Sequence, residues 1–241
     1  LELKKNRTAE GLFVAEGPKV VGDLMPTMHL RYVVATESWL KANHTKIPAE
    51  VEAFDVTEEE LRKVSYLQTP QEVLAVFELP GSNASSAIEF PKDKLSLALD
   101  GVQNPGNLGT IIRIADWFGI ENIYCSQDTA DAYNPKVVQA TMGSIARVNI
   151  TYTDITKLLT SLPTDYPVYG TLLDGEDIYA KELSKQGIIV MGNEGNGISQ
   201  EVRKHVNNRL LIPNFATAAD KAESLNVAIA TAITCSEFRR R

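Results

Sequence analysis

Short apolar runs alternate with helix-like segments in the first third of the chain. Runs rich in β-branched and aromatic residues predict strands, while apolar residues three and four positions apart predict helices. This pattern predicts strands over residues 11–15, 30–35 and 73–78 and helices over 18–25 and 58–64. We therefore expect a small α/β domain of about 80 residues at the N-terminus.

Further apolar runs predict the strands of a second, larger unit. They cover residues 95–99, 122–125, 168–172, 188–191 and 209–212, and helical patterns lie between them. Strands that alternate with helices are typical of a mostly parallel sheet covered on both faces. Ligands of such sheets bind beyond the carboxyl ends of the strands, so the loops at those ends are the first candidates for a site.

The stretch between these two units has the composition of a linker. It is small and polar, and it is bounded by Pro80 and Pro91. Such segments rarely take part in a packed core, so they mark domain boundaries. The sequence therefore predicts one domain over residues 1–79, a linker over 80–93 and a second domain over 94–241.

Composition and charge narrow the classes of function. A chain of 241 residues with 44% hydrophobic content can bury a core, and no apolar run approaches the roughly 18 residues of a membrane span, so we expect a cytoplasmic protein. Cys125 and Cys235 are too few for a cysteine-built metal site, and the three histidines lack metal-ligand spacing, so we expect no metal. The net charge of -7 argues against non-specific coating of nucleic acid, although basic residues cluster at both termini.

Three loops after predicted strands carry the candidate chemistry. They cover residues 100–109, 191–199 and 224–230. Glycines allow a tight exit from a strand, and Asn107 or Thr110 could cap the helix that carries Arg113. Ser224 and Asn226 offer a hydroxyl and an amide at the start of another apolar helix. Backbone N–H groups at helix starts bind polar ligands, so the three loops suggest one composite site.

Alternative interpretations of these loops stay open at this point. Each loop could be an ordinary turn before a helix, although Arg113 stands among apolar residues, where we expect a buried guanidinium to have a partner. Asp128 follows Gly109 at about the distance expected of a ribose-binding acid in a dinucleotide fold, but the glycine spacing does not match that fold. Glu194 stands between glycines, which argues against a polyphosphate ligand.

At these positions the sequence resembles the SpoU (TrmH-type) branch of the SPOUT RNA ribose methyltransferases. That branch bears three ordered motifs, N-x-G-x-x-x-R, G-x-E-G-x-G and I-P followed by S-L-N-V. Their residues here are Asn107, Gly109, Arg113, Gly192, Glu194, Gly195, Gly197, Ile212, Pro213 and residues 224–227. Arg7 and residues 13–17 are similar to the start of the family's substrate-binding domain, so the resemblance covers nearly the whole chain.

The resemblance implies a fold, a cofactor and partners. The fold is α/β, with a small N-terminal ribosomal-protein-like substrate-binding domain followed by a SPOUT domain that has a parallel sheet and a deep trefoil knot. The cofactor is S-adenosylmethionine, and the substrate is a ribose 2′-hydroxyl of RNA, ribosomal RNA first and transfer RNA second. The family also implies an obligate homodimer in which the partner subunit completes each active site.

The resemblance assigns roles to individual residues as well. The implied catalytic residues are Asn107, Arg113, Glu194 and Asn226. The implied cofactor-binding residues are Thr171, Met191, Gly192, Asn193, Gly195, Gly197, Leu211, Ile212, Ser224, Leu225 and Asn226. The implied RNA-binding residues are Lys4, Lys5, Arg7 and Arg113. Two departures from the family pattern are the longer segment over residues 214–223, which lacks the family's glycine, and Gln139, which replaces a common arginine.

A mechanism follows from these roles as a hypothesis. The methyl group of a sulfonium is already activated, so the enzyme mainly aligns the ribose oxygen and manages one proton. Because a guanidinium stays protonated, Arg113 is expected to grip a phosphate and the 2′-oxygen. Asn107 and Asn226 would orient ribose and cofactor, while Glu194 would hold a partner arginine or accept the proton late. The alternative is a non-catalytic RNA-binding or ribosome-assembly factor, against which the intact set of four residues argues.

Overall fold

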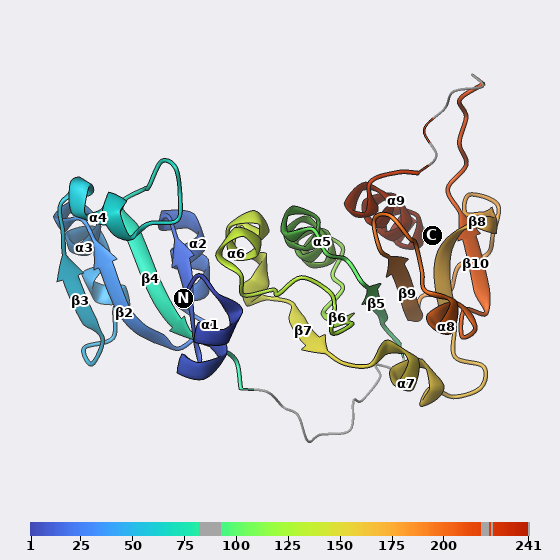
Figure 1. The fold of residues 1–241 in the computed structure, drawn as a ribbon, viewed down its shortest axis with the longest axis horizontal. Coiled ribbons are helices and arrows are strands. Elements are labelled where there is room, and N and C mark those ends of the chain that lie inside the picture. Colours follow the sequence, from blue (N-terminus) through green and yellow to red (C-terminus); the bar gives the residue numbers. More distant parts are fainter. Residues whose placement is uncertain (82–92, 218–221, 223, 241) are drawn as a thin grey trace. The chain divides into compact units, whose positions relative to one another are not determined.

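The computed structural model describes residues 1–81, 93–217, 222 and 224–240 (Figure 1). The chain forms two compact units. One comprises Leu1–Ala87 with Asp131–Ala146, and the other comprises Ile88–Ala130 with Arg147–Arg241. The predicted linker over residues 80–93 lies almost entirely outside the described residues, and the division at that linker stays a prediction. The segment Asp131–Ala146 groups with the first unit, although the sequence predicted it within the second domain.

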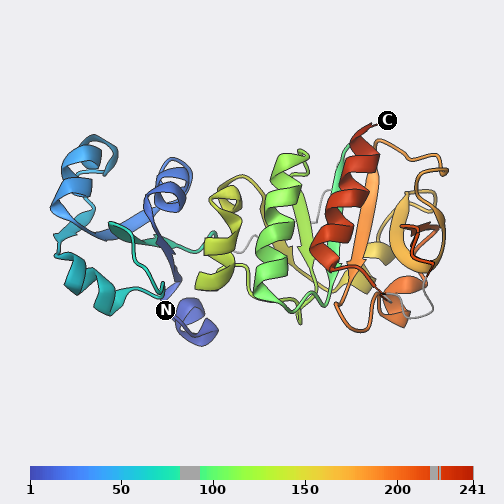
Figure 2. The same ribbon diagram turned by 90° about the horizontal axis from the view of Figure 1, so that it is seen from above.

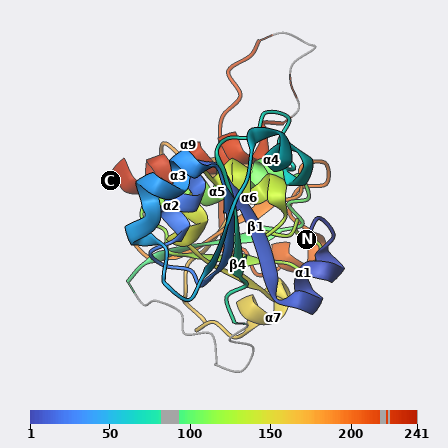
Figure 3. The same ribbon diagram turned by 90° about the vertical axis from the view of Figure 1, so that its left-hand side faces the viewer.

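A four-stranded sheet forms the centre of the first unit, in the order β1-β4-β2-β3. Its strands are β1 (Leu12–Glu16), β2 (Leu30–Ala35), β3 (Glu52–Asp55) and β4 (Val73–Glu78). The β1/β4 and β2/β4 pairs are antiparallel and the β2/β3 pair is parallel. The helices α2 (Pro18–Leu24) and α4 (Glu58–Val64) lie on opposite sides of this sheet (Figure 3). Leu61 of α4 packs against Val14, Leu74 and Val76 on its side.

The segment that enters the first unit from later in the chain packs on β1. It contains α6 (Pro135–Thr141) and the short 3-10 helix η2 (Ser144–Ala146). The ring of Tyr133 contacts the ring of Phe13 on β1, with 4.9 Å between their centroids. These contacts bury apolar surface of β1.

Most elements of the first unit follow the sequence pattern. The predicted helix over residues 58–64 and the strands over 30–35 and 73–78 are confirmed with the same bounds. A capping box of Thr57 and Glu60 starts that helix. The sequence missed α1 (Lys4–Glu10), α3 (Glu37–Asn43), the 3-10 helix η1 (His44–Lys46) and β3. All four residues of β3 are exposed, so that edge strand has no apolar face to reveal it.

The second unit contains a six-stranded parallel sheet in the order β10-β8-β9-β5-β6-β7. Its strands are β5 (Leu95–Asp100), β6 (Asn122–Cys125), β7 (Asn149–Tyr152), β8 (Val168–Asp177), β9 (Gly187–Gly192) and β10 (Asn208–Leu211). The five predicted strands are confirmed, with β8 five residues longer than predicted. The sequence missed β7, an edge strand on which no residue is fully buried. The parallel sheet that the sequence predicted is thus confirmed.

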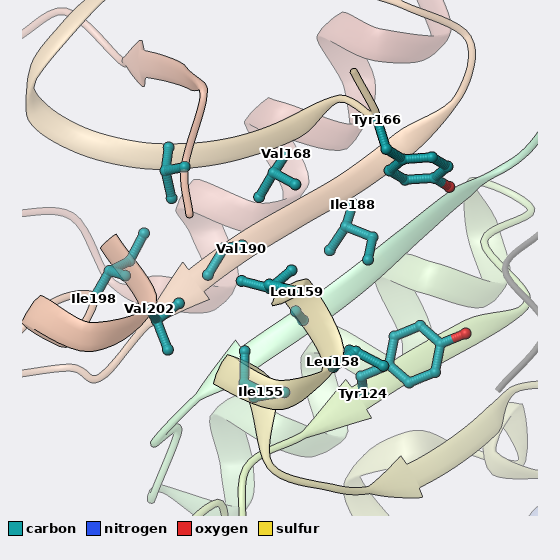
Figure 4. Packing of buried hydrophobic residues seen from close by; sticks show 12 residues of the cluster. Tyr124, Ile155, Leu158, Leu159, Tyr166, Val168, Ile188, Val190, Ile198 and Val202 are labelled. Atoms are coloured by element: carbon teal, nitrogen blue, oxygen red, sulfur yellow. The ribbon is translucent and has the colours of Figure 1, made fainter. Parts of the chain in front are cut away.

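Helices cover both faces of this sheet (Figure 1). Figure 2 shows α5 (Pro105–Trp117) and α9 (Val227–Arg240) side by side on one face, where they pack against each other. On the other face, α7 (Ile155–Thr160) and α8 (Gln200–Arg203) pack over the strands. Figure 4 shows Ile155, Leu158 and Leu159 in one cluster with Val168 and Val190 in this second layer of the core. The trefoil knot stays a prediction of the family resemblance.

None of the described helices is both long enough and apolar enough to cross a membrane. The two cysteines, Cys125 and Cys235, are buried as expected of core residues. Burial raises the pKa of the Cys235 thiol to about 12, so the thiol stays protonated and unreactive at neutral pH.

Candidate active site

Two loops at the carboxyl edge of the parallel sheet are hydrogen-bonded to each other. The first follows β5 and the second follows β9. Asp100 Oδ2 accepts a bond from the backbone N–H of Ser199 (2.7 Å), and the Asn193 amide donates to the carbonyl of Gly101 (2.6 Å). Each loop therefore holds the other in place, which is the preorganisation that a binding site needs.

The second loop closes on itself as a tight turn. Asn193 and Gly197 donate backbone N–H bonds to each other's carbonyls (2.9 and 3.0 Å). A Cβ at Gly192 would lie 2.2 Å from the carbonyl carbon of Gly197, so only glycine fits there. Asn193 Oδ1 also accepts from the N–H groups of Gly195 and Asn196 (2.9 and 3.0 Å). Both ends of its amide are bonded within the two loops, so the Asn193 side chain shapes the turn, and its predicted cofactor contact stays a prediction.

A chain of side-chain hydrogen bonds joins the three predicted loops. Glu194 Oε1 accepts from Asn107 Nδ2 (3.0 Å), and Asn107 Oδ1 accepts from Asn226 Nδ2 (2.9 Å). Asn226 Oδ1 in turn accepts from the backbone N–H groups of Ala228 and Ile229 at the start of α9 (2.9 and 3.3 Å). The cap on α9 and the carboxylate thus fix the orientation of both amides from opposite ends. These contacts bring together the three loops that the sequence predicted to form one composite site.

Glu194 is held by several donors in addition to Asn107. The backbone N–H groups of Gln103 and Asn104 donate to its two oxygens (3.1 and 3.0 Å). Burial by itself would raise the pKa of Glu194, but the hydrogen bonds from the Asn107 amide and the backbone outweigh burial and lower that pKa. A carboxylate that is ionised and already bonded is a poor proton acceptor. This argues against the expectation that Glu194 accepts the proton late.

The first loop starts its helix at a different residue from the one predicted. Asn104 caps α5, because its Oδ1 accepts from the N–H groups of Gly106 and Asn107 (2.8 and 3.1 Å). The sequence favoured Asn107 or Thr110, and neither is the cap. Asn107 instead turns its amide toward Glu194. The Asn-Pro pair is a signal that could have located this start, since proline is common at the first helical position.

Arg113 lies on an exposed face of α5, contrary to the expectation that it is buried with a partner. It makes no hydrogen bond or ion pair with any residue that the structure describes. The helix buries Leu108, Ile111 and Ile112 on its other side, so apolar neighbours in sequence did not imply burial of the arginine. Arg113 shares its face with Trp117, four residues on, which is 85% exposed.

The predicted cofactor-binding residues lie around the same edge of the sheet. Met191, at the end of β9, is 1% exposed, and Thr171 Oγ1 lies 3.7 Å from its sulfur. Leu211 and Ile212 are half-buried, and Leu225, next to Asn226, is 51% exposed. Ser224 is exposed, and the glycines at 192, 195 and 197 belong to the turn. Open apolar surface beside convergent polar groups fits an adenosine-bearing cofactor such as S-adenosylmethionine.

The predicted RNA-binding residues of the N-terminus divide into two kinds. Lys4 and Lys5 are exposed on α1. Arg7 is only 2% exposed, and it donates to the carbonyls of Leu1 and Glu2 (2.8 and 2.6 Å) while pairing with a carboxylate of the same unit. A guanidinium with these partners has no face for a phosphate, so we do not retain Arg7 as an RNA contact.

Comparison with known proteins agrees with the geometry. The model of the SpoU rRNA Methylase family matches residues 94–236, and that of the MRM3-like substrate binding domain matches residues 1–75. A 23S rRNA (guanosine(2553)-2′-O)-methyltransferase, RlmP of Bacillus subtilis, is 29% identical over 99% of this chain and 93% of its own.

Solved structures resemble the whole chain. A protein from Porphyromonas gingivalis, described as of the TrmH family of RNA methyltransferases, is 42% identical with a TM-score of 0.89 and covers 100% of this chain and 94% of its own. An AdoMet-bound rRNA methyltransferase from Sinorhizobium meliloti is 31% identical with a TM-score of 0.86, over 99% and 91% of the two chains.

The fold, the bonded loops and these matches define an S-adenosylmethionine-dependent RNA methyltransferase. More narrowly, the chain belongs to the SpoU rRNA methylase family, whose model covers more than half of it.

Proposed function

We propose that this protein methylates a ribose 2′-hydroxyl of ribosomal RNA, with transfer RNA as the second candidate. The observation that carries the proposal is the bonded chain of Glu194, Asn107 and Asn226 at the carboxyl edge of the sheet. The name of the Bacillus subtilis relative, which covers nearly the whole chain, supports a ribosomal substrate. In this proposal the protein acts on that substrate in the cytoplasm.

The two asparagines have the hydrogen-bonding capacity to orient a hydroxyl. Asn107 Oδ1 uses one lone pair for Asn226 and keeps the second, while Asn226 Nδ2 keeps its second hydrogen. A 2′-hydroxyl can donate to the first and accept from the second. When bound, S-adenosylmethionine supplies an activated methyl group, and Thr171, Leu211, Ile212 and Leu225 are the residues that would hold it. The asparagine pair then fixes the direction from which the hydroxyl oxygen approaches.

The protein acts as a homodimer in this proposal. The outer face of α5 and α9 exposes Trp117 (85%) and Ile229 (52%), and large exposed apolar side chains on packed helices are typical of subunit interfaces. Arg113 shares the face of Trp117, six positions along α5 from Asn107, so it points away from its own asparagine pair. Arg113 therefore serves the site of the partner subunit, where it grips a phosphate and the 2′-oxygen.

Methyl transfer to RNA tests this function. Radiolabelled S-adenosylmethionine is offered with total unmodified RNA, which is then separated into ribosomal and transfer fractions, and the Arg113→Ala protein is the control. We expect label in the ribosomal fraction that the variant loses. Label confined to transfer RNA would make transfer RNA the substrate. If no label appears, ribosomal subunits are offered in place of free RNA. Cofactor binding with no label in either substrate would favour a non-catalytic assembly factor.

A further inference from the structure

Two arginines of the second unit share one carboxylate oxygen. Arg203 of α8 and Arg209 of β10 both donate to Oδ2 of Asp174, the latter over 2.9 Å. The side chains are 30%, 49% and 48% exposed for Arg203, Arg209 and Asp174. Two positive charges and one negative charge leave this cluster with a net positive charge.

The guanidinium groups keep most of their donors for a ligand. A guanidinium carries five N–H donors, and each of these arginines makes this single side-chain bond within the described part of the chain. The rigid fork of donors matches the oxygens of a phosphate, and a guanidinium is less strongly hydrated than an ammonium. The shared carboxylate holds two such forks close together. The two side chains are therefore already ordered before a phosphate binds, which lowers the entropy cost of binding.

The cluster lies at the same sheet edge as the asparagine pair. Arg209 is paired in register with Gly170 of β8, and Gly170 is paired with Val190 of β9, two residues before the end of that strand at Gly192. Because all six strands are parallel, these positions approach the edge where the bonded loops lie. Arg203 stands one helical turn after Ser199, whose N–H binds Asp100 in the first loop.

We propose that Arg203 and Arg209 bind a backbone phosphate of the RNA next to the target nucleotide, with Asp174 positioning both guanidiniums. The proposal rests on the proposed function for its substrate. The competing explanation is structural: the ion pairs would only hold β8, whose pairing with β10 shifts register between Arg209 and Leu210. The two explanations predict opposite effects for removal of the Asp174 charge.

Substitutions at the cluster separate the explanations. We expect Arg203→Gln and Arg209→Gln each to weaken RNA binding about tenfold. In each variant, the slope of log affinity against log salt concentration should fall by about the amount of one phosphate contact. The affinity for the cofactor should not change. Asp174→Asn should strengthen RNA binding, because the amide oxygen can still accept from both guanidiniums and hold them together, while the competing negative charge is removed. Arg147→Gln is the matched control. Arg147 also pairs with a carboxylate, that of Asp116, but it lies just before the amino end of β7, whereas the bonded loops follow the carboxyl ends of the strands.

Two measurements on the same proteins complete the test. Fluorescence anisotropy with a labelled ribosomal RNA fragment gives RNA affinity across salt concentrations, and calorimetry gives S-adenosylmethionine affinity. The proposal is overturned if both arginine variants bind RNA as Arg147→Gln does, or if Asp174→Asn weakens binding of RNA and cofactor together. If the wild-type protein binds RNA through the cluster but transfers no methyl group, the proposed function is wrong, and the proposed phosphate site is retained.

Discussion

Replacing Glu194 with Gln tests the order of donors and acceptors in the site. The carboxylate accepts from two backbone N–H groups and from Asn107. The two backbone donors bond different oxygens, Gln103 to Oε2 and Asn104 to Oε1, so the single oxygen of a glutamine can keep only one of them. With that oxygen in the place of Oε1, the bonds from Asn104 and Asn107 stay, and the glutamine NH2 group faces the N–H of Gln103. The variant therefore loses the charge and at least one of the three bonds that hold the side chain.

The size of the effect follows from these contacts. A hydrogen bond to a charged group contributes roughly 1.5–3 kcal/mol and a neutral one about 1 kcal/mol when buried. Glu194 is exposed to solvent, which screens part of the difference, so we expect a loss of about 2 kcal/mol in transition-state binding. That loss corresponds to a decrease of about thirtyfold in kcat/KM.

A second substitution supplies the control. Asn107→Asp alone places two carboxylates face to face. In the double variant Glu194→Gln with Asn107→Asp, the glutamine NH2 group donates to the new aspartate and the aspartate accepts from Asn226, so the chain of bonds is restored with the charge moved one residue along. Methyl-transfer kinetics should show the double variant to be more active than Asn107→Asp alone. If Glu194→Gln retains wild-type kcat/KM, or if the double variant is no more active than Asn107→Asp alone, the positioning role is wrong. A general base at Glu194 would give no such rescue.

Other consequences of the structure can be measured independently. The pKa of Glu194 is lowered from its ordinary value of 4.5, so its contribution to stability is present above that value; the difference in Tm between wild type and Glu194→Gln should be constant there and shrink as pH falls through the lowered pKa. Mixing Arg113→Ala with Asn226→Ala subunits after unfolding and refolding together should restore about a quarter of wild-type activity, because half of the dimers carry one intact composite site; no recovery would place Arg113 in its own subunit's site. Met142 ends α6 with a φ of 51°, so Met142→Gly should stabilise the protein by about 1 kcal/mol in urea unfolding, and destabilisation would contradict the strain argument. Asp131→Ala leaves a buried guanidinium without its counter-charge and should cost about 3 kcal/mol by the same assay, whereas a change within error would show that solvent reaches the arginine.

The sequence predicted the elements whose apolar pattern matches their burial. Buried strands such as β4 and β9 are continuous apolar runs, and α4 begins at a capping box that can be recognised in four residues. Edge strands gave no such signal, because all of β3 and alternate residues of β7 face solvent. The pattern reports burial, so it misses elements that bury little.

The sequence predicted which residues belong to the candidate site, but only part of how they are arranged. It predicted that the loops with Asn107, Glu194 and Asn226 meet, and the structure joins these three side chains by direct hydrogen bonds. What could not be predicted was the direction of each side chain. Arg113 is exposed among apolar neighbours because a helix turns 100° per residue, and Arg7 is buried because a carboxylate far away in the sequence meets it.

The chain of amides also determines when the site appears during folding. Its two side-chain bonds join residues 87 and 119 positions apart, and contacts of such long separation form late because large loops must close first. Asn226 comes immediately before α9, so a growing polypeptide lacks the site until residue 226 has been synthesised. Onset of methyl transfer during refolding therefore marks the docking of α9, and a folding intermediate in which this helix is not docked is inactive however compact it is.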